Sequence, residues 1–279
     1  MQAEILTIYD SSLCSVHNFL CRCQDCSVSE KEYQENFSIA YIRKGNFKFN
    51  VFRNDLDAYS GLFLICKPGY EYHVGHIHNM PDECTIFSFS PHSTSLLLAQ
   101  TDAFSFFFNN PDMQSLLVKA TPEMEYLHFC IFNLLSTSRC PQLYVEQLMV
   151  ELFIMILSAG STTHHKTHLT EKQKRYYLPV IETVKEFING HYTEEISLPQ
   201  LAALGHMSPF HFNRLFRQFT LSSPYGYLRQ IRLKEAQLQI SHTKSSITAI
   251  AFATGFNSLE HFSAAYKKHF GQSPVAMRS

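Results

Sequence analysis

The sequence lacks the features of several classes of protein. No apolar run reaches the ~18 residues that a membrane-spanning helix needs, so we expect no membrane partner. The amino terminus lacks the basic-then-apolar pattern of a secretory signal, which predicts a cytoplasmic protein. The eight cysteines of the 279-residue chain are scattered rather than spaced as a disulfide framework. In a reducing compartment they are expected as thiols or metal ligands.

Basic residues are outnumbered in the first part of the chain, and acidic residues are outnumbered in the second. The net charge is −1, but residues 1–169 carry 10 Lys and Arg against 17 Asp and Glu, and residues 170–279 carry 13 against 7. This asymmetry predicts an acidic module joined to a module that can meet a polyanion.

The joint between the two modules is predicted in a polar segment without apolar periodicity, residues 158–175. We expect a linker at 161–175, between a domain at 1–160 and a second at 176–279. Three histidines in this segment resemble a metal-binding tract, but a solvated linker is the favoured interpretation (His164, His165 and His168).

The residue pattern of the second module predicts short helices separated by tight turns. A helix that follows residue 177 has Pro179 suited to its first turn and Gly190 to its stop. Ser197 is placed to cap the next helix, the chain turns at 205–207, and Ser208 followed by proline is placed to start another. That helix has an apolar stripe at i, i+3, i+4, i+7 (Phe212, Leu215, Phe216 and Phe219), so its polar, cationic residues must face away from the core.

The same pattern occurs again about fifty residues later. Residues 245–256 supply a short helix and a turn containing Gly255, and Ser258 is placed to cap a second helix whose stripe contains Phe262 and Tyr266. Residues 224–241 between the copies can form one helix that fixes their separation. A short helix, a tight turn and a second helix with one apolar and one cationic face describe a helix-turn-helix. An ordinary all-α bundle with two similar hairpins is the alternative.

Residues 178–279 resemble the tandem helix-turn-helix domain of AraC/XylS-type transcription regulators. The resemblance is carried by SPFHFNRLFRQF, RLKEAQLQI, ITAIAFATGF and EHFSAAYKKHFGQSP. It implies a bacterial regulator of transcription, not an enzyme, whose two recognition helices begin near Ser208 and Ser258. The chain departs from the family at His206, where a small residue is usual, and at Leu221, where glycine is usual. We expect these two positions to strain the first motif slightly.

The recognition helices of such a domain enter successive major grooves about 34 Å apart. At the fifty-residue offset Arg214 corresponds to Ala264, and arginine can bind guanine with two hydrogen bonds where alanine cannot. We therefore expect the first helix to supply more base specificity, through Phe210, Asn213 and Arg214. Glu260 and Ser263 are expected to contribute at the second helix, and the phosphate contacts are expected from Arg217, Lys267 and Lys268. The predicted DNA-binding residues are Phe210, His211, Asn213, Arg214, Arg217, Leu259, Glu260, Ser263, Lys267 and Lys268.

The first module is rich in β-strand signals between residues 37 and 90. The runs FSIAYIRKGNFKFNVF, GLFLICKPGYEY and CTIFSFS are broken by turn signals (Gly45, Asn54-Asp55, Gly61 and Pro68-Gly69). They resemble the small cupin barrel of AraC-like regulators. The expected fold is thus α+β with two domains: a cupin-like β-barrel with a helical appendage, and an all-α double helix-turn-helix domain.

Residues 141–160 predict a helix that is apolar on more than one side. Such a helix buries more than one side, so we expect one face to pack on the barrel and another on a second protomer. A homodimer is the resulting prediction; burial wholly within the helix's own domain is the alternative.

Two segments carry candidate metal ligands. Cys23 and Cys26 have the spacing of a zinc site, and His76 and Cys84 are candidates to complete it. His76, His78 and Glu83 also resemble, imperfectly, the metal motif of cupin enzymes, so a cupin-type metalloenzyme with an appended helical domain is the alternative function. A redox-responsive thiol cluster, or ordinary free thiols, are the other interpretations.

The function predicted from these observations is sequence-specific binding of double-stranded DNA under control of the amino-terminal barrel. A small-molecule effector and RNA polymerase are expected partners, and zinc is the candidate cofactor. The barrel interior carries many aromatic residues but no constellation that identifies an effector.

Overall fold

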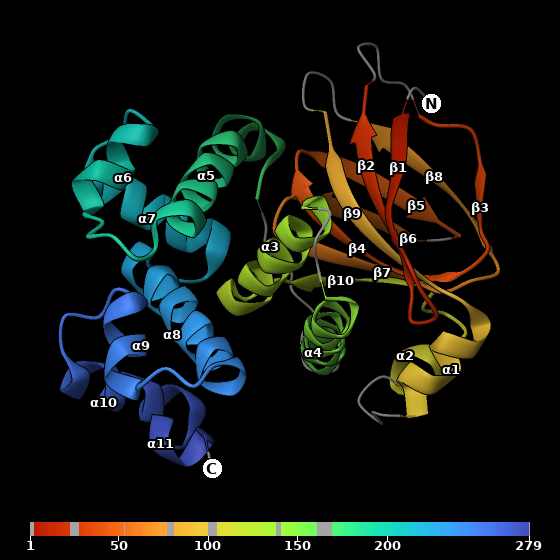
Figure 1. Ribbon diagram of the computed structural model, residues 1–279. Helices are drawn as coiled ribbons and strands as arrows, with labels where there is room; N and C mark the ends of the chain where they lie inside the picture. Colours follow the sequence, from red (N-terminus) through yellow and green to blue (C-terminus); the bar gives the residue numbers. More distant parts are fainter. Residues whose placement is uncertain are drawn as a thin grey trace. The chain divides into compact units, whose positions relative to one another are not determined.

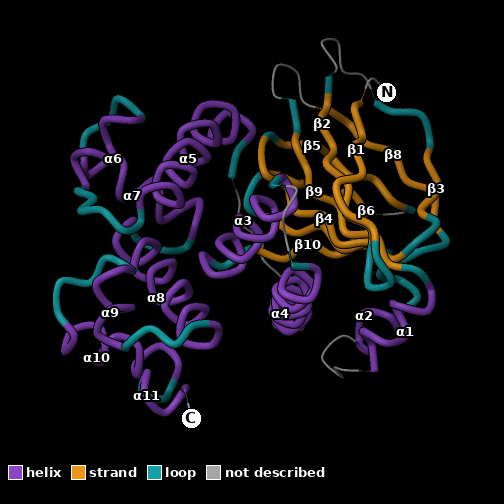
Figure 2. The backbone as a smooth tube through the Cα atoms, in the orientation of Figure 1, coloured by secondary structure: helices purple, strands orange, loops and turns teal. Residues whose placement is uncertain are grey.

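The computed structural model describes residues 3–22, 28–52, 54–76, 81–99, 105–137, 141–160 and 169–278. The chain divides into two units. The amino-terminal unit comprises Met1–Ala120 and Leu127–Glu182, and the carboxy-terminal unit comprises Thr121–Tyr126 and Thr183–Ser279. The first is rich in strands and the second is helical (Figures 1 and 2).

The amino-terminal unit contains two antiparallel sheets. The larger has the order β1 (Ala3–Asp10), β2 (Ser15–Cys21), β9 (Glu83–Phe89), β4 (Phe37–Lys44), β7 (Leu62–Cys66) and β10 (Ser115–Lys119). The smaller has the order β3 (Glu32–Gln34), β8 (Tyr70–His76), β5 (Asn46–Val51) and β6 (Asn54–Tyr59). Both sheets are open, so the structure confirms a β-rich domain but not a closed barrel.

Alternation along the strands gives each sheet an inner face. Phe47 and Phe49 of β5 and Leu64 and Cys66 of β7 line a cavity of about 220 Å³ between the two sheets. Successive side chains of a strand point to opposite sides, so the intervening residues of the larger sheet face outward. Phe87 and Phe89 of β9 pack edge-on against Phe153 of α4 (Gln142–Gly160) at ring-centroid distances of 5.1 and 4.9 Å.

Turn signals in this unit are confirmed at three positions and wrong at one. Gly45, Gly61 and Gly69 all have positive φ, as tight turns require. Asn54 and Asp55 instead lie inside β6, where they pair with Val51 and Asn50. A strand pairing with a buried neighbour overrides the turn preference of the two residues.

The burial of helix α4 agrees with the prediction that one of its faces packs on the sheets. Val145, Leu148, Leu152 and Ile156 are fully buried, consistent with packing on the sheet. Its length and apolar composition would also suit a membrane span. A helix that packs on a sheet in the core of a domain can have the same length and composition.

Helix α5 (Glu171–His191) begins earlier and runs further than predicted. Thr170 and Gln173 form reciprocal hydrogen bonds: Thr170 Oγ1 accepts from the Gln173 N–H at 3.2 Å and Gln173 Oε1 accepts from the Thr170 N–H at 2.9 Å. This capping box starts the helix within the expected linker, so residues 171–175 are helical, and residues 161–168 lie outside the described ones. Pro179 lies in the helix interior and Gly190 does not end it.

Burial explains why α5 tolerates its proline. Leu178, Ile181, Val184 and Ile188 are buried, and this packing exceeds the cost of the one backbone hydrogen bond that Pro179 removes. Lys174 is fully buried, and its Nζ lies 2.6 and 2.7 Å from the two carboxylate oxygens of Asp57 on β6.

The remaining described elements of the amino-terminal unit were not predicted. These are β1, β2, β3, β10, the helices α1 (Pro91–Ala99) and α2 (Ser105–Asn109), and the part of α3 (Pro122–Ser136) that belongs to this unit.

Candidate DNA interface

The first helix-turn-helix consists of α6 (Leu198–Leu204) and α7 (Pro209–Thr220). Ser197 caps α6 in a capping box with Gln200, and Ser208 Oγ accepts a hydrogen bond from the His211 N–H at 3.3 Å at the start of α7. Serine at these positions satisfies amide groups that have no partner in the first helical turn. The predicted start of the first recognition helix is confirmed.

The buried stripe of α7 is also confirmed. Phe212 and Phe216 have no exposed surface, and Leu215 and Phe219 are at most 4% exposed. The Phe216 ring meets Tyr227 of α8 (Pro224–His242) edge-on at 5.5 Å. Because the stripe fixes the rotation of the helix, the polar residues of α7 face away from this core.

The second helix-turn-helix repeats this arrangement in α9 (Ile247–Ala253) and α10 (Leu259–Phe270). Ser258 Oγ accepts from the His261 N–H at 3.1 Å, and Phe262 and Tyr266 are fully buried. They belong to one apolar cluster with Leu233, Ala236 and Ile240 of α8. The same helix thus contributes its first half to one core and its second half to the other.

The residue that follows the recognition helix differs between the two motifs, but its backbone conformation is the same. Leu221 after α7 and Gly271 after α10 both adopt the left-handed conformation, with φ of 59° and 78°. His206 in the first turn also has a positive φ, of 50°. This conformation costs roughly 1–2 kcal/mol for a residue with a Cβ, so the expected strain of the first motif is confirmed at both positions.

Gly255 is required where the second motif approaches the first. Its φ is +85°, and an added Cβ would lie 2.9 Å from the Arg232 guanidinium and 3.0 Å from the Thr193 carbonyl oxygen. Arg232 in turn donates hydrogen bonds of 2.7 Å to the carbonyl oxygens of Tyr192 and Glu194. Burial lowers the pKa of Arg232 from its ordinary value, but an arginine stays charged.

The predicted DNA-contacting side chains of α7 are mostly available to a ligand. Phe210 is 91% exposed, Arg214 and Arg217 are exposed, and His211 and Asn213 are partly buried. Arg214 Nη2 lies 3.4 Å from His211 Nδ1. Among the described residues, neither arginine forms an ion pair with a carboxylate.

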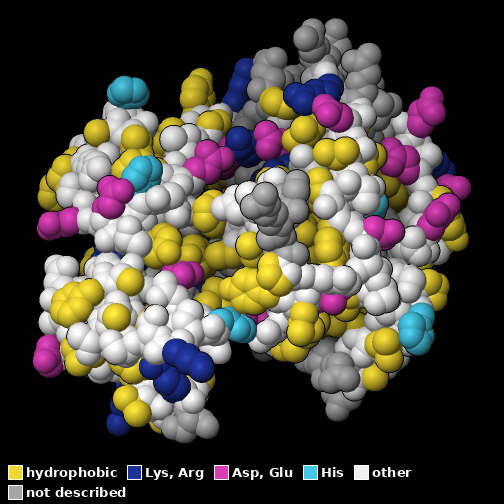
Figure 3. Space-filling view, in the orientation of Figure 1, with side chains coloured by type: hydrophobic (Ala, Val, Ile, Leu, Met, Phe, Trp, Pro, Cys, Tyr) yellow, Lys and Arg dark blue, Asp and Glu magenta, His cyan; other side chains and the backbone are white. Residues whose placement is uncertain are grey.

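On α10, Glu260, Lys267 and Lys268 are exposed and Ser263 is partly buried. No described carboxylate pairs with either lysine. Leu259 is partly buried and packs against the apolar cluster of the second motif, which leaves it less surface to offer DNA than its neighbour Glu260. Figure 3 shows lysine and arginine side chains in the lower part of the carboxy-terminal unit, where α11 (Pro274–Arg278) lies.

The candidate metal ligands of the amino-terminal unit fall in two groups. Cys23, Cys26 and His78 lie outside the described residues, so the structure neither joins them to a site nor separates them. His76 ends β8 and Cys84 lies in β9, both in the amino-terminal unit. Burial raises the pKa of the Cys84 thiol well above its ordinary value, and Asp82 raises it further.

Other buried thiols also favour the protonated state. Burial raises the pKa of Cys14 and Cys66 to about 12. A thiol that remains protonated is a poor nucleophile, so these two cysteines do not suit a redox sensor.

Sequence comparisons agree with the geometry of this interface. Residues 201–279 match a family model described as a helix-turn-helix domain. A Streptococcus mutans "Msm operon regulatory protein" is 26% identical over 249 residues, covering 88% of this chain and 84% of that protein. The "HTH-type transcriptional activator RhaS" of Pectobacterium carotovorum is 32% identical over 98 residues, covering 35% of each.

A solved structure also matches only part of this chain. The DNA-binding domain of AdpA, a "global transcriptional factor" in complex with a target DNA, is 30% identical and covers 35% of this chain and 88% of that one, with a TM-score of 0.34. Most of the curated relatives are matched over about a third to a half of their own length.

Residues 201–279 of this protein therefore form a helix-turn-helix domain, similar to the domains of DNA-binding regulators. More particularly, its carboxy-terminal domain is of the AraC/XylS type, which confirms the family that the sequence motifs indicated.

Proposed function

We propose that this protein is a bacterial transcription regulator that reads two successive major grooves of double-stranded DNA with α7 and α10. One observation supports this function: each helix is capped by a serine, buries one apolar face and exposes two cationic side chains that pair with no carboxylate among the described residues. These cations are Arg214 and Arg217 on α7 and Lys267 and Lys268 on α10. A helix of this kind presents side chains to base edges and phosphates.

The link between the motifs supports simultaneous binding by one protomer. Tyr227, Leu228 and Ile231 are buried in the first half of α8, and Leu233, Ala236 and Ile240 in the second half. A single helix shared by two cores resists bending because bending would open one of them. A rigid spacing suits two grooves one helical turn apart, about 34 Å.

Selection of bound sequences from random duplex DNA tests this function with the full-length protein. We expect each protomer to select two short determinants separated by about one helical turn. Recovery of a single determinant would show that α10 docks on the backbone without reading bases. Absence of any duplex binding at low ionic strength would refute the proposal as a whole, because non-specific phosphate contacts are strongest there.

The amino-terminal unit is proposed to control DNA binding through a small effector. The cavity between its sheets has apolar walls formed by residues such as Phe49, Leu64 and Ile86, with a few polar groups including Gln34 and Ser88. Apolar walls with few polar groups are typical of small-molecule sites. An effector that binds one conformation of the protein more tightly than another shifts the population towards the conformation that it binds.

The exposed face of α4 supports a homodimer. Leu143, Val150 and Ile154 are 79%, 37% and 43% exposed, and their spacing of seven and four residues places them on one side of the helix. A charge at the centre of this stripe, in Val150→Glu, is expected to convert the dimer to a monomer in sedimentation analysis. Glu151→Lys, one position along the helix, is the matched control. An unchanged mass for Val150→Glu would remove α4 from the proposed interface.

A further inference from the structure

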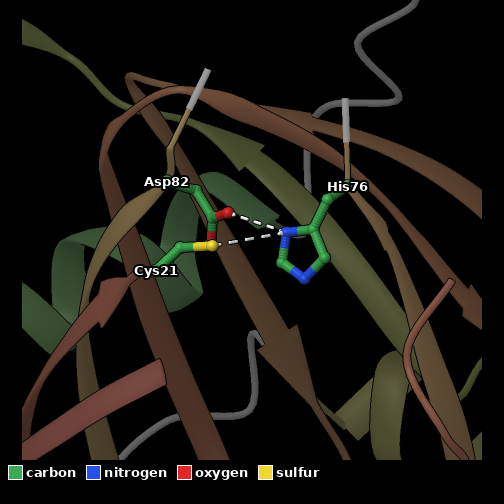
Figure 4. A group of neighbouring side chains, drawn as sticks. All are labelled: Cys21, His76 and Asp82. Atoms are coloured by element: carbon green, nitrogen blue, oxygen red, sulfur yellow. Dashed lines mark hydrogen bonds and ion pairs between the residues drawn. The ribbon is translucent and has the colours of Figure 1, made fainter. Parts of the chain in front are cut away.

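Three side chains from separate strands converge at one end of the amino-terminal unit. Cys21 ends β2, His76 ends β8 and Asp82 precedes β9. Their potential ligand atoms all lie within 4.8 Å of one another. The His76 Nδ1 atom is 3.0 Å from Asp82 Oδ1 and 3.9 Å from Cys21 Sγ (Figure 4).

The backbone holds these residues together independently of their side chains. The Cys21 N–H donates a 3.0 Å hydrogen bond to the Asp82 carbonyl oxygen. Gly45 approaches the same segment so closely that a Cβ would lie 2.7 Å from the Pro81 oxygen and 2.9 Å from Asp82 Cα. The position of Asp82 is therefore fixed from two sides.

The arrangement does not suit nucleophilic catalysis. In a cysteine–histidine–aspartate relay the thiol and the carboxylate use opposite nitrogens of the imidazole. Here the sulfur and the carboxylate oxygen both face Nδ1. Three different donor atoms that converge on one point are instead the geometry of a coordination site.

The cluster is buried, and the ion pair that Asp82 forms is with His76, which is charged only when protonated. The side chains of His76 and Asp82 are each 3% exposed, and among the described residues no lysine or arginine pairs with Asp82. A buried carboxylate needs a compensating charge. His76 Nε2 is also buried without a hydrogen-bond partner within the described part of the chain, so the contact with Asp82 does not satisfy the imidazole.

We propose that Cys21, His76 and Asp82 form a site for a divalent transition metal, with Zn²⁺ as the ion that best fits the donors. Thiolate, imidazole and carboxylate are all common zinc ligands, and three protein ligands leave a fourth position for water or a further group. Binding deprotonates Cys21 and releases that proton to solvent. This ligand set shares only His76 with the set expected from sequence, and Cys84 is not part of the cluster.

The test uses purified full-length protein, stripped with a chelator and titrated with Co²⁺, whose thiolate complexes absorb strongly, followed by competition with Zn²⁺. We expect one equivalent to bind. Cys21→Ser should abolish the thiolate absorption, and Asp82→Asn should lower the affinity by more than about 100-fold, because loss of an outer partner alone costs 10–100-fold. Cys14→Ser, which alters a buried thiol outside the cavity between the sheets in the same unit, is the matched control and should bind as the parent does.

X-ray absorption at the zinc edge keeps the proposal testable if a variant fails to fold. One sulfur ligand together with nitrogen and oxygen ligands supports the site. Two or more sulfur ligands would overturn this ligand set, as would full Co²⁺ affinity in Asp82→Asn or no stoichiometric metal in the parent protein. The metal measurement does not depend on whether the protein binds DNA. DNA binding is measured separately on the same preparation, so the two proposals can be refuted independently.

Discussion

Replacement of Arg214 tests whether the first recognition helix reads bases. Arg214 is exposed on α7, and its one side-chain hydrogen bond among the described residues is the 3.4 Å approach to His211. Arg214→Ala therefore removes little that stabilises the fold, and we expect the free energy of unfolding to change by less than about 0.5 kcal/mol. A lost bidentate contact to guanine costs about 1–3 kcal/mol, or roughly a 5- to 150-fold rise in Kd.

Lys267→Ala is the matched control for this prediction. Lys267 is an exposed cation on the corresponding helix of the second motif, and it also forms no ion pair with a described carboxylate. Its loss should weaken binding to every duplex alike and reduce the slope of log K against log salt by about 0.9.

Fluorescence anisotropy separates the two effects. Each variant is titrated with the selected duplex and with a random duplex at several salt concentrations. The Arg214→Ala penalty should fall mainly on the selected duplex, at one base position. An equal loss on both duplexes would refute the division between base reading and phosphate contact.

Two further predictions concern stability and follow from matched pairs of residues. An added Cβ meets nothing within 4 Å at either Gly271 or Gly190. Gly271→Ala should lower the free energy of unfolding by about 1 kcal/mol, because Gly271 has a left-handed backbone. Gly190→Ala should raise the free energy of unfolding by about 0.5–1 kcal/mol, because Gly190 lies in a helix. Thermal unfolding that shifts in the same direction for both would contradict this. Lys174→Met should cost about 1–3 kcal/mol, since it removes the fully buried partner of Asp57. Lys48→Met, whose side chain is 38% exposed, should cost less than about 1 kcal/mol; equal costs in chemical denaturation would contradict the role of burial.

Most of the carboxy-terminal unit could be predicted from sequence because its signals are local. Ser197, Ser208 and Ser258 cap their helices by accepting hydrogen bonds from amides three residues further on, and an apolar stripe at i, i+3, i+4, i+7 is complete within about two turns. The start of α5 differs from the prediction although its signal is also local, because the Thr170–Gln173 capping box lies in a polar segment whose composition predicts a linker. Pro179 lies in the interior of that helix rather than in its first turn, because the helix begins eight residues earlier, at Glu171.

The sequence by itself determined the two helix-turn-helix motifs, the apolar faces of their helices and the family to which the domain belongs, since each depends on residues a few positions apart. Only the tertiary structure decided that the strands form two open sheets, that Asp57 pairs with Lys174, and that Cys21, His76 and Asp82 converge. Pairing of β2 with β9 brings Cys21 to Asp82, and the other sheet contributes His76. Helix α5 brings Lys174 to Asp57 from more than a hundred positions away. Register follows from the pairing of whole strands, and no spacing in the sequence records it.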